Sequence, residues 1–468
     1  MAQKLKAGSI DSQRRDVGTD GHLRVALING HDYAGGAETV MRALARCLQD
    51  AGHPVAAWVG RVNAVSPSCW IREIPKPTDA AGCRGSSLAG DGDCAMPGEE
   101  DRRRTRFLNK GYFGLGLEYT LDFCRSAAFD RTDVVHLHNL HGHYLDLRAI
   151  ALLAERRPLV WTLHDFYAVT GGCAFPFSCS RWRDSCGACP SLGQYPLMTQ
   201  HDRTRTLLRL KRNWFADVPV TLICPSRHLA TAVESSGVFG WGDVRHVPYG
   251  VDTSVFHPHR ERARRELGIG GDERVLFLAA QGLDDPRKGV SHAVRAMRAL
   301  GDTQMTLLLA GKGDVAAMLG DLPLLTVRHA GYVSDPAEMA RLYAAADLYV
   351  FPSLAENFPC SVMESMACGT PVLAFAIDGV TEQVTDGRTG FLVPLGDAAA
   401  FANSPTDAMA DAIADTMAGV MRRAFGADLA AMGVAARAHA EREWALPVFL
   451  GRHMSIYREV SAYRAIQA

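Results

Sequence analysis

Short apolar runs of strand length alternate with longer stretches of helical periodicity along almost the whole chain, and this series occurs twice. The first series opens with "LRVALING" (23–30), which is followed by the helical "AETVMRALARCLQDAG" (37–52). The second opens with "RVLFLAAQ" (274–281) and runs to "TPVLAFAI" (370–377). Such alternation is typical of a parallel sheet covered by helices on both faces. The sequence therefore predicts the α/β fold class, with two doubly wound, Rossmann-like domains that face a cleft.

The length of the chain and its linker-like segments predict how it divides. A chain of 468 residues is too long for one ordinary hydrophobic core. The segment "VPYGVDTSVFHPHRERA" (247–263) has the proline and glycine content of a linker. We predict an N-terminal domain over 23–254, a C-terminal domain over 255–440 and a terminal segment over 441–468. The stretches predicted to be flexible are the tail 1–22 and the insertion 76–105.

Charge and hydropathy exclude several classes of protein. Acidic and basic residues are nearly balanced, at 51 and 50, and no basic run carries interleaved aromatic residues, so no nucleic-acid partner is expected. No apolar run approaches the roughly 18 to 20 residues that a membrane span needs, and the polar start lacks the apolar centre of a secretion signal. We therefore expect a cytoplasmic protein in which most of the 12 cysteines are reduced.

Two carboxylates, Glu356 and Glu364, lie beyond the apolar run 348–351, and no cation accompanies them in that stretch. Pro359 suits the first residue of a helix, because its missing N–H would have no partner there. Open α/β sheets bind ligands at the carboxyl ends of their strands, and the free amides of a helix N-terminus hold phosphate. Here those amides would belong to Cys360, Ser361 and Val362. The segment predicts a site for a phosphate that carries sugar hydroxyls; the alternative is a loop acid followed by a solvated helix residue.

The segment "PSLAENFPCSVMESMACGTPVLA" resembles the C-terminal signature of family-4 retaining glycosyltransferases of the GT-B fold. The resemblance covers nearly the whole chain from residue 23. "YAGGAETVMRALA" is similar to the family's N-terminal glycine loop, "PYGVDTSVFHP" to its interdomain linker and "DDPRKGV" to its diphosphate-binding segment. "HLHNLHGHYLDL" and "WTLHDFYAVTGGC" are similar to members that build surface polysaccharides. The terminal segment 441–468 resembles the helix that crosses back to the first domain.

The resemblance implies that a sugar moves from a nucleoside-diphosphate sugar to a hydroxyl of a saccharide acceptor, with its anomeric configuration retained and without a catalytic metal. The acceptor would be lipid-linked, and the chain would work at the inner face of the membrane. Two interpretations from other classes stay open. One is a sugar-nucleotide epimerase of the same fold, and the other is a non-enzymatic nucleotide- or zinc-binding module.

The resemblance also implies roles on the donor side. Glu364 would bind the donor ribose, while Glu356 and the backbone after it would hold the hydroxyls of the transferred sugar. Asn357 stands where many members have glycine. The remaining donor-binding candidates are Phe358, Pro359, Cys360 and Ser361.

Two further segments are predicted to meet the diphosphate. Arg287 and Lys288 would neutralise the leaving group, which gains negative charge as the glycosidic bond breaks. Gly35 and Gly36, between the first strand and its helix, would let the backbone approach the phosphate closely. An ordinary basic helix start and a plain turn are the alternatives.

Polar residues at two strand ends are the candidates for the acceptor side. His164 ends the run "PLVWTL" with Asp165 beside it, and the resemblance assigns His164 to the catalytic site. His136 and His138 alternate on "DVVHLHNL", so both point to one face and one of them can be core. His138 and Asn139, nearer the strand end, are the better acceptor candidates.

A basic stretch, "HDRTRTLLRLKRNWFAD", predicts a helix that places Arg205, Arg209 and Arg212 on one face, with Leu208 and Trp214 nearby. Such a face can dock on an anionic membrane, as suits a lipid-linked acceptor. The alternative is a solvated helix that packs through its leucines.

The segment 170–192 is a cysteine-rich loop that holds Cys173, Cys179, Cys186 and Cys189 without strand or helix periodicity. The Cys-x-x-Cys spacing at 186–189 lets two thiolates meet one Zn²⁺. Four sulfurs would complete the tetrahedron, so the zinc would shape the loop and leave no position for substrate. Disulfide or redox pairing and free thiols are the alternatives.

Overall fold

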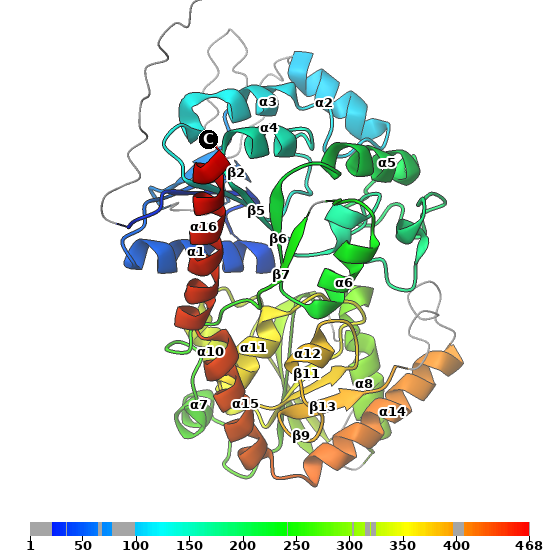
Figure 1. Ribbon diagram of the computed structural model, residues 1–468. Helices are drawn as coiled ribbons and strands as arrows, with labels where there is room; N and C mark the ends of the chain where they lie inside the picture. Colours follow the sequence, from blue (N-terminus) through cyan, green and yellow to red (C-terminus); the bar gives the residue numbers. More distant parts are fainter. Residues whose placement is uncertain are drawn as a thin grey trace, which may run out of the picture.

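The protein consists of two α/β domains, one above the other in Figure 1, joined by the linker after β7 and by a long C-terminal helix. The structure is a computed structural model. It describes residues 21–467 apart from residues 34, 64–67, 77–98, 241, 302–303, 314–318, 320–323 and 396–406. The predicted tail lies almost entirely outside the described residues, and so does most of the predicted insertion.

The N-terminal domain is built on a seven-stranded sheet of order β3-β2-β1-β4-β5-β6-β7, in which all paired strands are parallel. Strands β1, β4 and β6 are almost fully buried, as expected of a parallel sheet covered on both faces. The strands are β1 (Val25–His31), β2 (Val55–Arg61), β3 (Ile71–Glu73), β4 (Val134–Leu137), β5 (Leu159–Thr162), β6 (Val220–Cys224) and β7 (Asp243–His246). The helices are α1 (Gly36–Asp50), α2 (Glu99–Asn109), α3 (Glu118–Arg125), η1 (Ala127–Phe129), α4 (Ala149–Arg156), η2 (Phe166–Val169), η3 (Arg181–Arg183), α5 (Thr204–Phe215) and α6 (Arg227–Ser235).

The C-terminal domain is built on a six-stranded parallel sheet of order β10-β9-β8-β11-β12-β13. In both sheets the chain starts near the centre, runs to one edge and returns to build the other, so each sheet has a switch point where ligands bind. The strands are β8 (Val275–Gly282), β9 (Met305–Lys312), β10 (Leu325–His329), β11 (Leu348–Phe351), β12 (Val372–Phe375) and β13 (Gly390–Val393). The helices are α7 (Arg260–Leu267), η4 (Pro286–Lys288), α8 (Val290–Ala299), α10 (Pro336–Ala345), α11 (Cys360–Ala367), α12 (Val380–Gln383), α14 (Asp407–Phe425), α15 (Leu429–Trp444) and α16 (Leu446–Gln467).

The last helix, α16, leaves the C-terminal domain and lies beside α1 of the N-terminal domain (Figure 1). The Tyr457 hydroxyl is 2.6 Å from Nδ1 of His136 on β4, and Arg464 donates to the carbonyl of Ala154 at 2.6 Å. Tyr457 and His136 are fully buried. The chain end is thus packed into the core of the domain where the chain began.

The last residues of the segment 76–105, which the sequence predicts to be a flexible insertion, are helical. Helix α2 begins at Glu99. The basic run there lies in this helix, where Arg102, Arg103 and Arg106 are exposed and Phe107 contacts Tyr112. Among the described helices, none combines the length and the apolar character that crossing a membrane requires.

Candidate active site

The two predicted diphosphate-binding cations meet the first of the two glutamates. Nη1 of Arg287 and Nζ of Lys288, both in η4 after β8, each donate to Oε1 of Glu356 at 2.6 Å. Glu356 follows β11, which pairs with β8, so neighbouring strands deliver the three groups to one sheet edge. The carboxylate that has no cation in its own segment therefore finds two from 68 and 69 residues earlier.

Charge in this cluster is well defined. Burial tends to raise the pKa of Glu356, but Lys288 and Arg287 outweigh that effect and hold it below its usual value. The carboxylate is therefore ionised at neutral pH. A second carboxylate, Asp285, lies 3.7 Å from the guanidinium of Arg287, so two cations are shared between two carboxylates. The cations attract a phosphate group that reaches them.

Glu364, the second glutamate, lies in the second turn of α11 and is only partly exposed. Its Oε2 accepts a hydrogen bond of 3.2 Å from the Tyr343 hydroxyl. Burial raises the pKa of Glu364 to about 7, against the lowering effect of the Tyr343 bond. A carboxylate with so few hydrogen bonds retains acceptor capacity for hydroxyl groups.

The helix between the glutamates starts one residue later than predicted. Pro359 is the N-cap of α11, with ψ of 128°, and Cys360 is the first helical residue. The residue before Pro359, Phe358, is buried, and its ring meets Tyr249 and Trp444 edge-on. Only the backbone of Phe358 can therefore face a ligand. Cys360 and Ser361 are the first two residues of the helix, so their main-chain amides lie at its N-terminus.

Asn357 is used differently from the prediction of donor binding. Its Nδ2 donates to the carbonyl of His164 at 3.0 Å, and its Oδ1 accepts from the Ser226 hydroxyl at 2.6 Å. Both partners belong to the N-terminal domain, and the Asn357 side chain is 4% exposed. The amide therefore joins the two domains, and a glycine at this position could not make these bonds.

The glycine pair lies at the start of the first helix, which begins at Gly36. Gly35 is its N-cap in an extended conformation, with φ of −155°, so its backbone needs no left-handed freedom. A Cβ on Gly35 would lie 2.1 Å from Oε2 of Glu38. Gly35 thus leaves room for that buried carboxylate, whereas a Cβ on Gly36 would meet open space.

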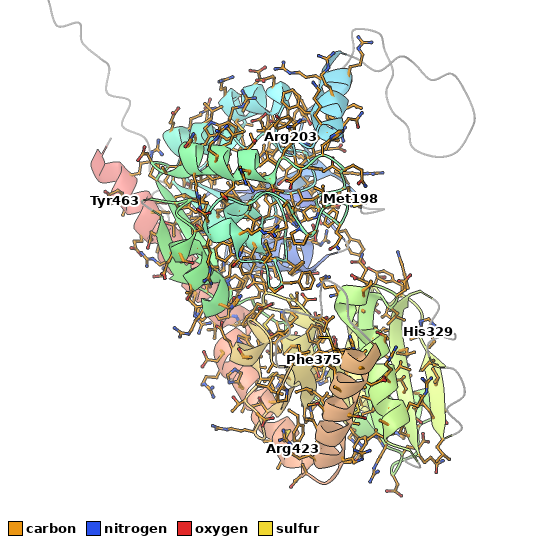
Figure 2. The ribbon with its side chains drawn as sticks, turned by 90° about the vertical axis from the view of Figure 1, so that its right-hand side faces the viewer. Met198, Arg203, His329, Phe375, Arg423 and Tyr463 are labelled. Carbon is orange, nitrogen blue, oxygen red and sulfur yellow. The ribbon has the colours of Figure 1, made fainter. Side chains whose placement is uncertain are left out.

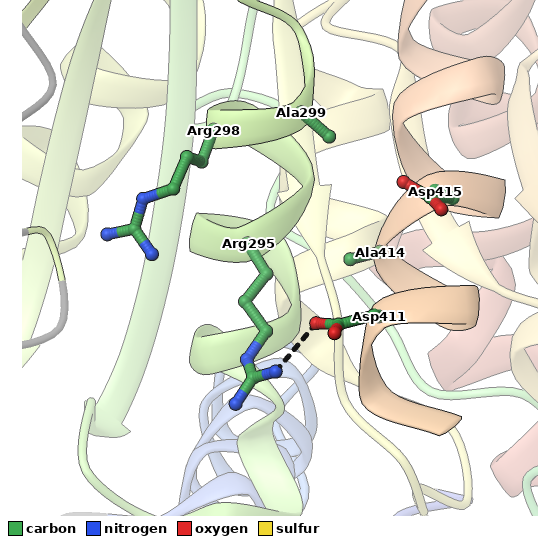
Figure 3. A pocket seen from close by; sticks show the side chains of 6 residues that line it. All are labelled: Arg295, Arg298, Ala299, Asp411, Ala414 and Asp415. Carbon is green, nitrogen blue, oxygen red and sulfur yellow. Dashed lines mark hydrogen bonds and ion pairs between the residues drawn. The ribbon is translucent and has the colours of Figure 1, made fainter. Parts of the chain in front are cut away.

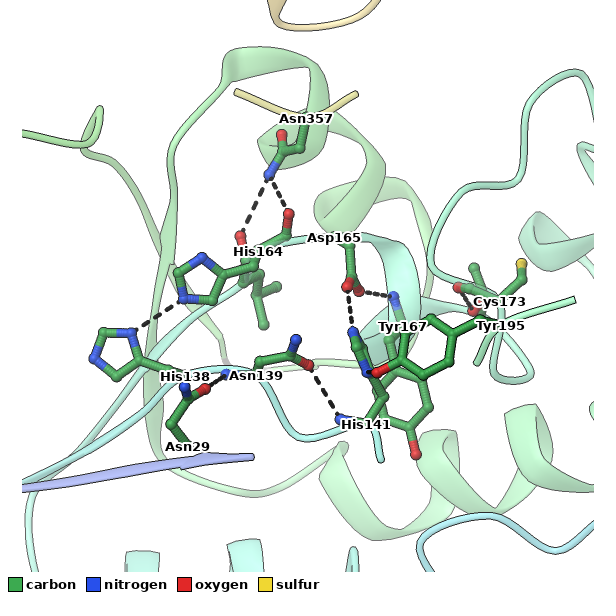
Figure 4. Close-up of polar contacts among 12 residues, drawn as sticks. Asn29, His138, Asn139, His141, His164, Asp165, Tyr167, Cys173, Tyr195 and Asn357 are labelled. Carbon is green, nitrogen blue, oxygen red and sulfur yellow. Dashed lines mark hydrogen bonds and ion pairs between the residues drawn. The ribbon is translucent and has the colours of Figure 1, made fainter. Parts of the chain in front are cut away.

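The predicted acceptor-side histidines form a buried chain, drawn in part in Figure 4. Nε2 of His164 is 3.1 Å from Nδ1 of His138, and Nδ1 of His164 is 2.7 Å from the Tyr249 hydroxyl. Both nitrogens of His164 thus have protein partners, which the assignment of this residue to the catalytic site did not anticipate. Burial lowers the pKa of His164 to about 4, so the ring is neutral at pH 7.

The other members of this chain divide between packing and the site. His136 is core, because its nitrogens bond Tyr457 and Thr162 at 2.6 and 2.8 Å. His138 is 1% exposed, and its Nε2 is buried without a hydrogen-bond partner. Its neighbour Asn139 makes two hydrogen bonds. Its main-chain N–H donates to Oδ1 of Asn29, and its own Oδ1 accepts from the main-chain N–H of His141.

Asp165 does not point freely into the cleft. Its Oδ2 accepts a bond of 2.9 Å from Nε2 of His141, and its Oδ1 accepts from the main-chain N–H of Tyr167 at 2.7 Å. The Tyr195 hydroxyl bonds the other nitrogen of His141 at 2.8 Å. Sequence reasoning missed His141 and Tyr195, although "NLHGH" offered the signal of a second histidine just beyond the strand end.

The cysteine-rich loop reaches the cluster of Arg287, Lys288 and Glu356 through Phe175, whose ring lies 4.5 Å from the guanidinium of Arg287. Its four cysteines are free thiols, and burial raises the pKa of Cys173, Cys186 and Cys189. Over the described part of the chain, no three His, Cys, Asp or Glu side chains come together as a metal site. The four sulfurs thus do not form a tetrahedral metal site in this structure, and zinc binding by this loop stays a prediction.

The basic helix predicted to dock on membranes is α5, and the residues named for that role differ in their exposure and contacts. Leu208 is 1% exposed, so it packs into the domain as the alternative interpretation expected. Arg212 is occupied by main-chain carbonyls, among them Ser236 at 2.9 Å. Arg205 and Arg209 are exposed and remain the only two of the predicted arginines that face solvent.

A second set of interdomain contacts, missed by the sequence analysis, lies at the start of α6. The carboxylate of Glu382 accepts from the main-chain N–H groups of Arg227 and His228 at 2.8 and 2.9 Å. A carboxylate at a helix N-terminus is stabilised by the helix dipole.

Figure 3 shows a separate pocket, between α8 and α14, where Arg295 and Asp411 pair at 2.8 Å. It contains no residue of the predicted site.

Comparisons with known proteins cover both domains. Residues 34–255 match the family model described as Glycosyltransferase Family 4, and residues 273–411 match the model described as Glycosyl transferases group 1. WcaC of Escherichia coli (strain K12), named as a glycosyl transferase of colanic acid biosynthesis, is 30% identical over 298 residues, which cover 61% of this chain and 69% of WcaC.

Solved structures show the same architecture. Sucrose-phosphate synthase from Thermosynechococcus elongatus aligns with a TM-score of 0.63 at 21% identity, over 94% of this chain and 100% of that one. HepE of Anabaena in complex with UDP and glucose aligns with a TM-score of 0.60 at 18% identity, over 93% and 99%. The alignments span both sheets, which confirms the predicted two-domain GT-B fold.

Proposed function

Because the chain belongs to glycosyltransferase family 4, we propose that it moves a sugar from a nucleoside-diphosphate sugar to a hydroxyl of a lipid-linked saccharide, with the anomeric configuration retained. The reaction would serve the synthesis of a surface polysaccharide at the inner face of the membrane. The similarity to WcaC, a protein named for colanic acid biosynthesis, supports this class of product.

The observation that carries the proposal is the cluster of Arg287 and Lys288 around Glu356, with the N-terminus of α11 and Glu364 beside it. The diphosphate gains negative charge as the glycosidic bond breaks, and cations already in place stabilise that charge without reorganisation. Glu364 would accept hydrogen bonds from the ribose hydroxyls. These fixed cations supply the electrostatic stabilisation for which other transferases use a divalent ion, so we propose catalysis that needs no metal.

The stereochemical course follows from which groups flank the reacting carbon. Glu356 is held by both cations, which makes it a weak nucleophile. Both nitrogens of His164 are already bonded to protein groups. We therefore propose a same-face displacement, in which the departing phosphate oxygen takes the proton of the acceptor hydroxyl. Closure of the domains, held in part by Asn357, would exclude water from this step.

The test is a panel of nucleoside-diphosphate sugars incubated with the purified chain. A glycosyltransferase releases the nucleoside diphosphate from one of the donors. Release is slow when the sugar is transferred to water and faster when a saccharide acceptor is present. NMR of the product reports its anomeric configuration. An inverted product would contradict the retaining mechanism. An epimerised nucleotide sugar without transfer would favour the epimerase interpretation, and no turnover of any donor would favour a binding module.

A further inference from the structure

Tyr195 is an exposed aromatic residue whose hydroxyl is nevertheless fixed. The residue is 63% exposed, yet its hydroxyl donates to Nδ1 of His141 at 2.8 Å. The two rings meet edge-on, with centroids 5.2 Å apart and planes at 84°. The ring is thus anchored at its polar end (Figure 4), and much of the residue stays open to solvent.

The anchor itself is buried. Asp165 and His141 have side chains that are 11% and 8% exposed, and their bond of 2.9 Å puts the proton of His141 on Nε2. Nδ1 is then an acceptor, which is what the Tyr195 hydroxyl requires. Burying a carboxylate is costly unless it is paired and hydrogen-bonded. Here the pair orients one exposed ring that contributes little to the core.

The anchored ring lies on the acceptor side of the donor cluster. His141 and Asp165 follow β4 and β5, at the carboxyl edge of the N-terminal sheet. The main-chain carbonyl of the preceding residue, His164, accepts the interdomain bond from Asn357. The loop that carries Tyr195 also carries Phe175, which packs against Arg287. The same loop therefore touches the cation that holds Glu356.

We propose that the Tyr195 ring, held by Asp165 and His141, is a stacking platform for one sugar ring of the acceptor. This inference rests on the proposed function. The C–H face of a hexose is apolar and packs on an aromatic face, while its hydroxyls stay solvated or hydrogen-bonded. Because the phenol proton is committed to His141, the phenol oxygen also offers a lone pair to a sugar hydroxyl. Met198, three residues further along the same loop, is 65% exposed.

The experiment compares Tyr195→Ala and Tyr195→Phe with Tyr463→Ala. Tyr463 on α16 is 65% exposed, so it is a matched aromatic control, and Figure 2 shows it on the opposite side of the domain from Met198. The donor is the nucleotide sugar that the panel identifies, and the acceptor probes are the octyl glycosides of glucose, galactose, mannose and N-acetylglucosamine. Loss of the ring in Tyr195→Ala should raise the KM for the accepted glycoside roughly tenfold while the donor KM stays at its wild-type value.

Tyr195→Phe keeps the stacking face and loses the anchor, so its acceptor KM should lie between those of the wild type and Tyr195→Ala. An acceptor KM in Tyr195→Ala equal to that of Tyr463→Ala would overturn the platform. So would equal losses toward donor and acceptor, because these would mean that Tyr195 only supports the loop. Failure of the wild type to release nucleoside diphosphate from every donor would instead reject the proposed function.

Discussion

Asn357 of the C-terminal domain donates a side-chain hydrogen bond of 3.0 Å to the main-chain carbonyl of His164 in the N-terminal domain. The Ser226 hydroxyl bonds the other end of the same amide at 2.6 Å. The residue directly after Glu356 is thus fixed by the N-terminal domain. The position of Glu356 and the approach of the two domains are therefore coupled through adjacent residues.

Replacing Asn357 with glycine should weaken the closed arrangement. Each lost hydrogen bond costs about 1 kcal/mol, so we expect a several-fold fall in kcat/KM. Small-angle X-ray scattering with bound nucleoside diphosphate should show a larger radius of gyration than the wild type. Ser226→Ala, which removes one bond to the same amide, should change both quantities in the same direction and by less. An unchanged radius together with unchanged kcat/KM would show that Asn357 does not hold the domains.

Lys288→Ala tests the assigned role of the cation cluster. Loss of one of two charges at the leaving group should cost on the order of 2 to 4 kcal/mol of transition-state stabilisation, which lowers kcat by about 30- to 1000-fold. Arg295→Ala is the control, since Arg295 pairs with Asp411 at an exposed pocket away from this site. Wild-type turnover by a folded Lys288→Ala protein, with folding checked by circular dichroism, would reject this assignment.

Much of this site follows from the alternation of strands and helices, which a sequence pattern can predict, and from the family resemblance. Arg287, Lys288 and Glu356 each follow a strand, and parallel strands bring such residues to one edge. A sequence pattern does not predict which side chains make contacts between two domains, so the partners of Asn357 could not be inferred. His141 and Tyr195 are 54 residues apart, and only the path of an irregular loop brings them together. For the same reason, the sequence did not predict that Tyr249 in the linker bonds Nδ1 of His164.

Glu364 should make stability depend on pH in a defined window. Burial raises its pKa from 4.5 to about 7, so between these values the folded protein holds a proton that the unfolded chain has released. The free energy of unfolding should therefore fall as the pH rises from about 4.5 to 7. Glu364→Gln cannot release a proton, so its unfolding free energy should fall less over that range. Urea titrations of both proteins at several pH values measure the difference, and parallel curves would show that Glu364 has an ordinary pKa.

Lys211 gives a structural reason to test the cysteine-rich loop for zinc. Its side chain is 1% exposed, and its ammonium donates to the main-chain carbonyls of Tyr167 and Thr170, next to the thiols of Cys173 and Cys186. Burial lowers the pKa of Lys211 to about 7, and thiolates bound to Zn²⁺ would place negative charge beside it that favours its charged form. The main-chain N–H of Gly171 already donates to Sγ of Cys186 at 3.4 Å, a bond that a thiolate strengthens.

We expect elemental analysis of protein purified without chelator to find about one zinc ion per chain. Cys186→Ser combined with Cys189→Ser should remove the metal, because two of four ligands are lost, and should make the loop more sensitive to proteolysis. Cys69→Ser, an exposed cysteine outside the loop, is the control and should keep the zinc. The thiol count separates the remaining interpretations: a metal-free, active protein with four reactive loop thiols would mean that they are free, whereas loss of reactive thiols in pairs would mean disulfides.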